Sequence, residues 1–155
     1  MELKRIESFC VDHNLLERGI YTSRIDGDVT TYDIRMRVPN RAPFLENVAI
    51  HTIEHLFATL ARNSEYANRV IYFGPMGCRT GFYFLTRDIA PAEVIALIIR
   101  IFEQIAVYEG EVPGSTAKEC GNYKELRLED AKREAVEFLP VIREWTAEKL
   151  RYRQK

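Results

Sequence analysis

The fold of this chain is decided by residues 29–38, VTTYDIRMRV, in which apolar and polar side chains alternate. Alternate residues of a strand lie on opposite faces of a sheet, so one face is apolar and the other is polar. The apolar face carries Tyr32, Ile34, Met36 and Val38, and the polar face carries Asp33, Arg35 and Arg37. This pattern predicts a half-buried antiparallel strand, with Arg35 as a solvated charge. A turn at residues 26–28, Asp-Gly-Asp, joins it to a preceding strand at 19–26.

The chain that follows alternates between helical and strand patterns. Apolar residues recur at helical spacing over residues 47–62, and again from Pro91 to about Tyr108, which predicts two amphipathic helices. Residues 70–73 and 81–86 are rich in aromatic and branched side chains and predict two further strands, separated by an irregular loop.

The charged C-terminal segment completes the predicted fold. It is helical from about Leu128, with a kink expected at Pro140. The resulting order, β-β-α-β-β-α-α, predicts an α+β fold in which an antiparallel sheet of about four strands packs against three to four helices. At 155 residues we expect one domain, spanning residues 1–155.

Composition argues against several classes of partner. The 22 basic and 23 acidic residues nearly cancel, to a net charge of -1, so no nucleic-acid or membrane-surface partner is expected. Residues 1–7 contain no apolar signal-peptide core, and the strongly apolar run 94–99 is far shorter than the roughly 20 residues that a membrane span needs. We therefore expect a cytoplasmic protein.

The three cysteines fit that compartment. Cys10, Cys78 and Cys120 are an odd number, and disulfide frameworks are rare in reducing compartments. We expect free thiols that are available as metal ligands or nucleophiles. Buried cysteine is commonly a small hydrophobe, and this is the role expected for Cys10.

Two of the three histidines lie four residues apart in residues 51–55, HTIEH. On a helix, positions four apart share one face, so His51 and His55 can reach one metal ion, with Glu54 beside them. These side chains flank the apolar stripe of the helix, which predicts a pocket wall. A carboxylate beside a metal can act as a general acid or base.

Two histidines are too few for a metal site, so the remaining ligands must come from elsewhere. A catalytic zinc-like site needs three protein ligands and an open position, whereas a structural site needs four. Cys120 and Cys78 both lie in glycine-containing loops, and either thiolate would suit such a metal. If both bind, the site is closed and non-catalytic. If one binds, the other is a free thiol that can form an acid-base pair with Glu54.

A different enzyme class also uses this spacing. The order His-x-x-Glu-His occurs in inverzincin metallopeptidases, in which the glutamate activates water and a distal glutamate completes the ligand set. The chain is short for such a protease, and it offers a cysteine in the ligand role.

Taken together, these segments resemble the S-ribosylhomocysteine lyase (LuxS) family over nearly the whole chain. The strings that carry the resemblance are residues 7–9 (ESF), 12–14 (DHN), 32–35 (YDIR), 51–56 (HTIEHL), 75–81 (PMGCRTG) and 119–122 (ECGN). Each string alone is weakly specific, but their order and the length of the chain make the combination specific. The resemblance implies a two-layer LuxS-like fold.

The resemblance also implies the reaction and its machinery. S-ribosyl-L-homocysteine would be cleaved to L-homocysteine and 4,5-dihydroxy-2,3-pentanedione, the autoinducer-2 precursor, by carbonyl migration and β-elimination. The implied metal ligands are His51, His55 and Cys120. The implied acid-base pair is Cys78 and Glu54.

Cofactor and partners are implied in the same way. Each subunit would hold one divalent metal ion, with Fe²⁺ as the native ion and Zn²⁺ or Co²⁺ as alternatives. The chain would form a homodimer with active sites at the subunit interface. Ser8, His13 and Arg35 would bind the substrate from the partner subunit.

The chain departs from the family pattern just before the Pro-Met-Gly-Cys string. The family has an acid, an apolar residue and a serine there, whereas this chain has Tyr72, Phe73 and Gly74. The departure affects contacts to the homocysteine end of the substrate and none of the residues assigned to the chemistry.

Overall fold

The computed structural model describes residues 1–153 and confirms the predicted order of elements. The strands are β1 (Gly19–Asp26), β2 (Val29–Arg35), β3 (Val70–Pro75) and β4 (Gly81–Arg87). The helices are α1 (Asn47–Arg62), α2 (Pro91–Ala106) and α3 (Leu128–Ile142). Short 3₁₀ turns are η1 (Glu7–Phe9), η2 (Ala67–Arg69), η3 (Tyr123–Glu125) and η4 (Ala147–Leu150).

The four strands form one antiparallel sheet in the order β1-β2-β4-β3. β2 ends at Arg35, three residues before the predicted end. The backbone N–H groups of Met36 and Arg37 both donate to the carbonyl of Thr80, so the regular ladder stops there. Pro140 lies in the last turn of α3, which ends two residues later at Ile142.

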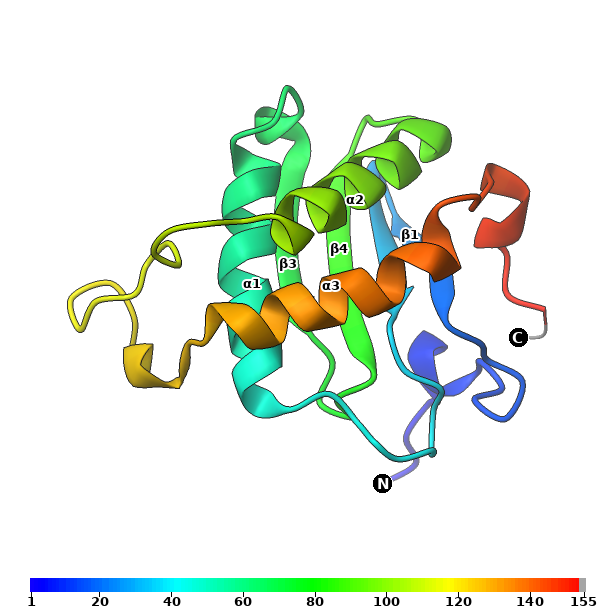
Figure 1. Cartoon of the computed structure of the whole chain (residues 1–155). Coiled ribbons are helices and arrows are strands. Elements are labelled where there is room, and N and C mark those ends of the chain that lie inside the picture. Colours follow the sequence, from blue (N-terminus) through cyan, green and yellow to red (C-terminus); the bar gives the residue numbers. More distant parts are fainter. Residues whose placement is uncertain (154–155) are drawn as a thin grey trace.

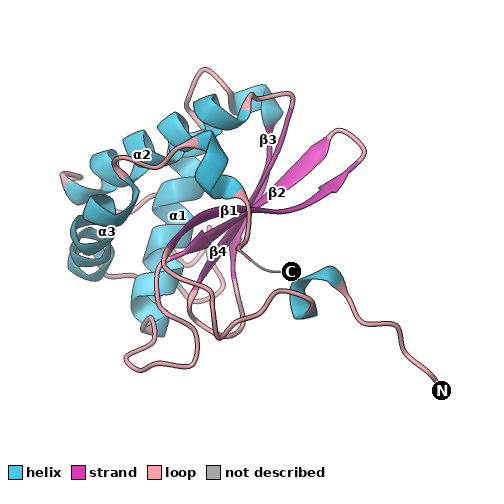
Figure 2. Ribbon diagram, turned by 90° about the vertical axis from the view of Figure 1, so that its right-hand side faces the viewer, coloured by secondary structure: helices cyan, strands magenta, loops and turns pink. Residues whose placement is uncertain are grey.

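All three helices cover one face of the sheet (Figures 1 and 2). The core between the two layers is largely aromatic. The Phe57 ring of α1 stacks on Phe73 of β3 with centroids 3.9 Å apart, and Phe102 and Phe138 carry the packing on to α2 and α3. This packing fixes α1 against the β3 edge of the sheet and determines where its polar face lies.

The other face of the sheet is only partly covered. The N-terminal segment lies on that side in Figure 2, and a second small core joins Val11, Leu16 and Tyr21 to Trp145 and Tyr152 of the C-terminal tail. The Tyr21 and Tyr152 rings stack 5.0 Å apart. The part of this face near β3 and β4 stays open.

Two sequence-based expectations about single residues are wrong. Arg35 is 3 % exposed, because the polar face of β2 lies beneath the terminal segments. Cys10 is exposed, because it follows η1 in the N-terminal segment and lies outside both cores. The expectation of free thiols is confirmed for all three cysteines. Within residues 1–153, no helix is both long enough and apolar enough to cross a membrane.

Candidate metal centre and thiol network

The polar edge of α1 carries the first half of the site. Ile50, Ile53 and Phe57 turn into the core, which leaves His51, Glu54 and His55 half-buried at the margin of the helix. The two imidazole rings have their centroids 4.7 Å apart, as expected for residues one helical turn apart. The predicted pocket wall is confirmed for Glu54 and His55, which line a cavity that does not include His51.

Cys120 reaches the histidines from the loop between α2 and α3. Its backbone N–H donates to the carbonyl of Thr116, and its Sγ accepts a hydrogen bond from the backbone of Asn122 at 3.4 Å. Cys120 Sγ lies 3.4 Å from His51 Nε2. Ligand atoms of His51, His55 and Cys120 lie within 4.8 Å of one another.

Contacts outside this group orient the two imidazoles. His55 Nδ1 lies 2.8 Å from the carbonyl of Pro113, which can only accept, so Nδ1 donates this bond and Nε2 is the ring nitrogen that faces the group. Gly114 makes this approach possible, because a Cβ there would lie 3.0 Å from His55 Nδ1 and the backbone φ is +74°. His55 is thus fixed by the loop that also leads to Cys120.

Glu125, at the end of η3, takes the corresponding place beside His51. Its Oε1 lies 3.0 Å from His51 Nδ1, although the buried nitrogen does not align as a hydrogen bond. Carboxylate and carbonyl partners behind metal-bound imidazoles are a general feature of metal sites. Neither partner could be predicted from the sequence, because no local pattern relates Glu125 or Pro113 to a helix that lies more than 50 residues earlier.

The arrangement fits a divalent transition metal. Two imidazole nitrogens and one thiolate form a three-ligand set with a position left for water or substrate. The orientation of His55 and the carboxylate behind His51 both suit Nε2 as the ligand atom. In the part of the chain that the structure describes, this is the one such group of three, and it does not include Cys78.

Glu54 lines a cavity of about 330 Å³ next to this group. The lining includes His55, Pro113 and Tyr72. Glu54 is therefore placed to act on a molecule bound in the cavity beside the three residues that could hold a metal.

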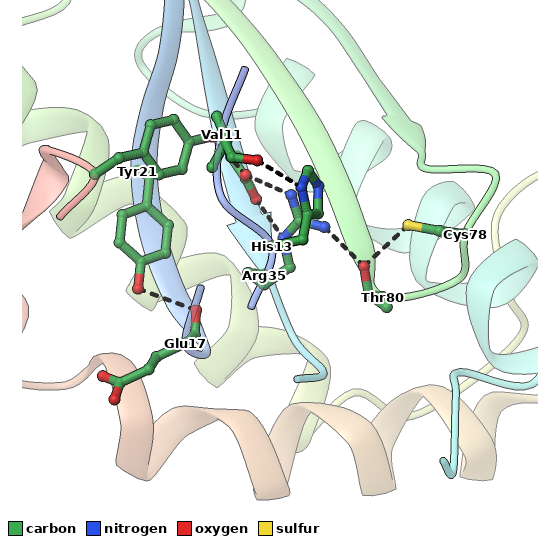
Figure 3. A network of polar contacts seen from close by, with 9 residues as sticks. Val11, His13, Glu17, Tyr21, Arg35, Cys78 and Thr80 are labelled. Carbon is green, nitrogen blue, oxygen red and sulfur yellow. Dashed lines mark hydrogen bonds and ion pairs between the residues drawn. The ribbon is translucent and has the colours of Figure 1, made fainter. Parts of the chain in front are cut away.

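Cys78 belongs to a second cluster, built on β2 and the β3–β4 loop. Its Sγ lies 3.0 Å from Thr80 Oγ1, which accepts a 2.8 Å hydrogen bond from Arg35 Nη1 (Figure 3). Arg35 also makes a bidentate pair with Asp33 at 2.6 and 3.1 Å, and the Tyr152 hydroxyl donates to the same carboxylate at 2.6 Å. Burial acts to lower the pKa of Arg35, but the charge of Asp33 and its hydrogen bonds raise it above the usual value.

The remaining predicted residues lie on the open side of the sheet. Ser8, in η1, lines a second cavity of about 280 Å³ together with Tyr72 and Tyr83. His13 Nδ1 bonds the carbonyl of Val11 at 2.9 Å and is drawn with the Cys78 network in Figure 3. The structure thus gathers His51, Glu54, His55 and Cys120 in one cluster, and Arg35 and Cys78 in another.

The departure at Tyr72, Phe73 and Gly74 has a structural explanation. The Tyr72 ring lies over Gly74 and occupies the place that a side chain at residue 74 would take. Phe73 faces the core, whereas Tyr72 is 56 % exposed and lines both cavities. The position of the Tyr72 ring therefore requires a glycine at residue 74, since a serine there would displace the ring.

Comparison with known proteins agrees with these features. The family model for S-ribosylhomocysteinase (LuxS) matches residues 6–149. The S-ribosylhomocysteine lyases of Finegoldia magna and Borreliella afzelii are 47% and 46% identical to this chain, over 97% of its length and 99% of theirs. That of Clostridium acetobutylicum is 42% identical over the same shares. Since both matches cover nearly the whole chain, the chain belongs to the S-ribosylhomocysteinase (LuxS) family.

Proposed function

We propose that this chain is a carbon–sulfur lyase that cleaves S-ribosyl-L-homocysteine to L-homocysteine and 4,5-dihydroxy-2,3-pentanedione. The observation that carries the proposal is the convergence of His51, His55 and Cys120 beside a cavity lined by Glu54, in a chain of this family. The whole chain, 1–155, would act as one catalytic domain in the cytoplasm. Its second product would be the autoinducer-2 precursor, used as a signal or released as a by-product of the activated methyl cycle.

The geometry disfavours the two alternatives. A metallopeptidase would use a glutamate as third ligand, but the atom beside His51 Nε2 is Cys120 Sγ, and Glu125 lies behind the ring at Nδ1. A closed, non-catalytic site within one chain would need Cys78 as fourth ligand, but Cys78 Sγ contacts Thr80 in the second cluster.

His51, His55 and Cys120 would hold one divalent ion per subunit, Fe²⁺ in the native protein and Zn²⁺ or Co²⁺ as replacements. When bound, the ion acts as a Lewis acid that polarises the substrate carbonyl. The nearby orienting contacts at Pro113 and Glu125 would keep both imidazoles in the ligating tautomer.

Cys78 and Glu54 would carry the proton transfers. Cys78, as thiolate, takes the C2 proton of the open-chain sugar and returns a proton at C1, which moves the carbonyl from C1 to C2. A second transfer of this kind moves it to C3. Glu54 then removes the C4 proton, the electron pair forms the C4–C5 double bond, and the thiolate of homocysteine leaves C5. The resulting enol loses its hydroxyl proton and gains one at C5, which gives the dione.

The two clusters would meet in a homodimer with two shared active sites. Glu54 and the metal ligands would come from one subunit, and Ser8, His13, Arg35 and Cys78 from the other. Exposed apolar side chains on the open side of the sheet support such an interface, namely Ile6, Phe9 and Tyr72. The location of Cys78 outside the ligand group supports a site completed by a second chain.

The direct test is release of a thiol from S-ribosylhomocysteine by metal-replete protein, read with a colorimetric thiol reagent. We expect steady release from the wild type and none from Cys78→Ser. A folded, metal-loaded wild type that releases no thiol would refute the lyase proposal. Hydrolysis of peptides by the same sample would favour the metallopeptidase instead.

The shared site has its own test in mixtures of two inactive variants. After subunit exchange, half of the dimers formed by Cys78→Ser and Glu54→Gln are mixed. If the two residues act from different subunits, each mixed dimer has one intact site of two, so about a quarter of wild-type activity returns. No recovery in a mixture shown to contain mixed dimers would place both residues in one subunit.

A further inference from the structure

A buried row of polar side chains connects the C-terminal tail to the thiol of Cys78. It runs from Tyr152 through Asp33, Arg35 and Thr80 to Cys78 Sγ, with every step between 2.6 and 3.0 Å. Figure 3 shows its last part, from Arg35 through Thr80 to Cys78. Asp33, Arg35 and Thr80 are each at most 3 % exposed, whereas Cys78 is exposed. A fixed charge pair therefore lies directly behind an accessible thiol.

Thr80 is the residue that connects the charge to the sulfur. Arginine can only donate, so Thr80 Oγ1 must accept the hydrogen bond from Arg35 Nη1. This leaves the Thr80 hydroxyl proton free to point at Cys78 Sγ, 3.0 Å away. A thiolate can only accept, so when Cys78 loses its proton the direction of this bond is fixed from Thr80 to sulfur.

The groups behind Thr80 keep its hydroxyl in one orientation. Arg35 cannot turn away, because Nε and Nη2 are engaged by Asp33, and Asp33 is held by the Tyr152 hydroxyl. A hydroxyl that accepts from a buried cation is a stronger donor on its other side, because hydrogen bonds in a row polarise one another. The network thus places the polarised hydroxyl of Thr80 as a hydrogen-bond donor next to Cys78 Sγ.

We propose that Thr80 is a positioning residue that holds the Cys78 thiolate and transmits the charge of Arg35 to it. The inference rests on the proposed function, because it concerns the thiol that would move protons on the sugar. Thr80 touches no reacting atom of the substrate and acts only through Cys78. The methyl group of Thr80 has no part in this role.

The test compares Thr80→Val, which keeps the shape and removes the hydroxyl, with Thr80→Ser, which keeps the hydroxyl. The first readout is the rate at which iodoacetamide alkylates Cys78 in the metal-loaded protein at neutral pH, followed by peptide mass spectrometry. Cys10, exposed in the N-terminal segment, is the internal control in the same sample. The backbone bonds of Thr80 to residues 36 and 37 are preserved in both variants.

We expect Thr80→Val to slow alkylation of Cys78 roughly threefold, because the variant lacks the hydrogen-bond donor that lies 3.0 Å from the sulfur. Alkylation of Cys10 should not change, and Thr80→Ser should behave as the wild type. In the thiol-release assay, Thr80→Val should lower kcat with KM almost unchanged. Wild-type alkylation in a folded Thr80→Val variant would overturn the proposal, and so would a Thr80→Ser variant as slow as Thr80→Val.

This experiment separates the two proposals. The alkylation rate needs no substrate, so it reports on the network even if the wild type releases no thiol from S-ribosylhomocysteine. In that case the lyase proposal fails and the role of Thr80 at the thiolate stands. If thiol release is normal in Thr80→Val, the role of Thr80 fails and the lyase proposal stands.

Discussion

Glu125 offers the sharpest test of the proposed metal centre, because it lies beside the proposed ligand His51 and is not itself proposed to bind the metal. Its Oε1 lies 3.0 Å from His51 Nδ1, on the side of the ring opposite to Cys120 Sγ. A carboxylate at this place favours the tautomer with the proton on Nδ1 and makes Nε2 a stronger ligand. We therefore predict that changes at Glu125 weaken metal binding while all three ligands remain.

The size of the effect follows from the geometry. Loss of such an outer partner costs about 10- to 100-fold in metal affinity at other sites. The Glu125 side chain is 35 % exposed, so solvent screens its charge, and we expect the lower end, about tenfold, for Glu125→Ala. Glu125→Gln keeps the size and shape of the side chain beside Nδ1 and should lose less.

The assay is competition for Zn²⁺ or Co²⁺ against a chromogenic chelator, with the apparent dissociation constant as the result. Glu129→Gln is the matched control, since it removes the same charge from an exposed residue in the first turn of α3. We expect wild-type affinity for this control. Equal affinities for Glu125→Ala and Glu129→Gln would refute the argument that the carboxylate orients His51.

Three further predictions concern other parts of the site. Cys78→Ser and Glu54→Gln should abolish thiol release yet retain metal in elemental analysis, whereas His51→Ala should lose the metal; loss of metal from Cys78→Ser would contradict the ligand assignment. Gly114→Ala should weaken metal binding and lower the melting temperature, since its φ of +74° and the nearby imidazole both disfavour a Cβ. Burial and a neighbouring carboxylate raise the pKa of Tyr152, so its contribution to folding is complete below pH 10 and is lost as the pH rises further; in urea titrations the stability of Tyr152→Phe should fall less steeply above pH 10 than that of the wild type.

Local sequence patterns were sufficient to predict the strands and helices that bury one face. The alternation in β2 and the helical spacing in α1 place Ile34 and Ile53 in the core, and both are fully buried. The same spacing places His51 and His55 on one margin of α1, so two of the three members of the metal group could be predicted from the helix alone. Choosing Cys120 rather than Cys78 as the third ligand needed the family resemblance. Both thiols lie in loops, where the sequence has neither helical nor strand periodicity.

The partners of these residues could not be predicted, because they depend on tertiary packing. Pro113 and Glu125 meet α1 only because the segment between α2 and α3 folds back over it, and their sequence carries no regular pattern. The end of β2 at Arg35 has a similar cause. It depends on a carbonyl of Thr80, which a pattern confined to residues 29–38 does not contain.

Arg35 shows most clearly why the alternating pattern of β2 alone predicted an exposed side chain where the structure has a buried one. A polar residue on a strand facing away from the core is exposed unless another part of the chain covers it, and here Tyr152 arrives from 119 residues beyond Asp33. Burying an ion pair is a poor way to gain stability, since the cost of desolvation can exceed the attraction. The buried pair is better explained by the orientation that it gives Arg35 than by a gain in stability. Asp33 occupies two nitrogens of Arg35, so the third is aimed at Thr80 and, through it, at the thiol.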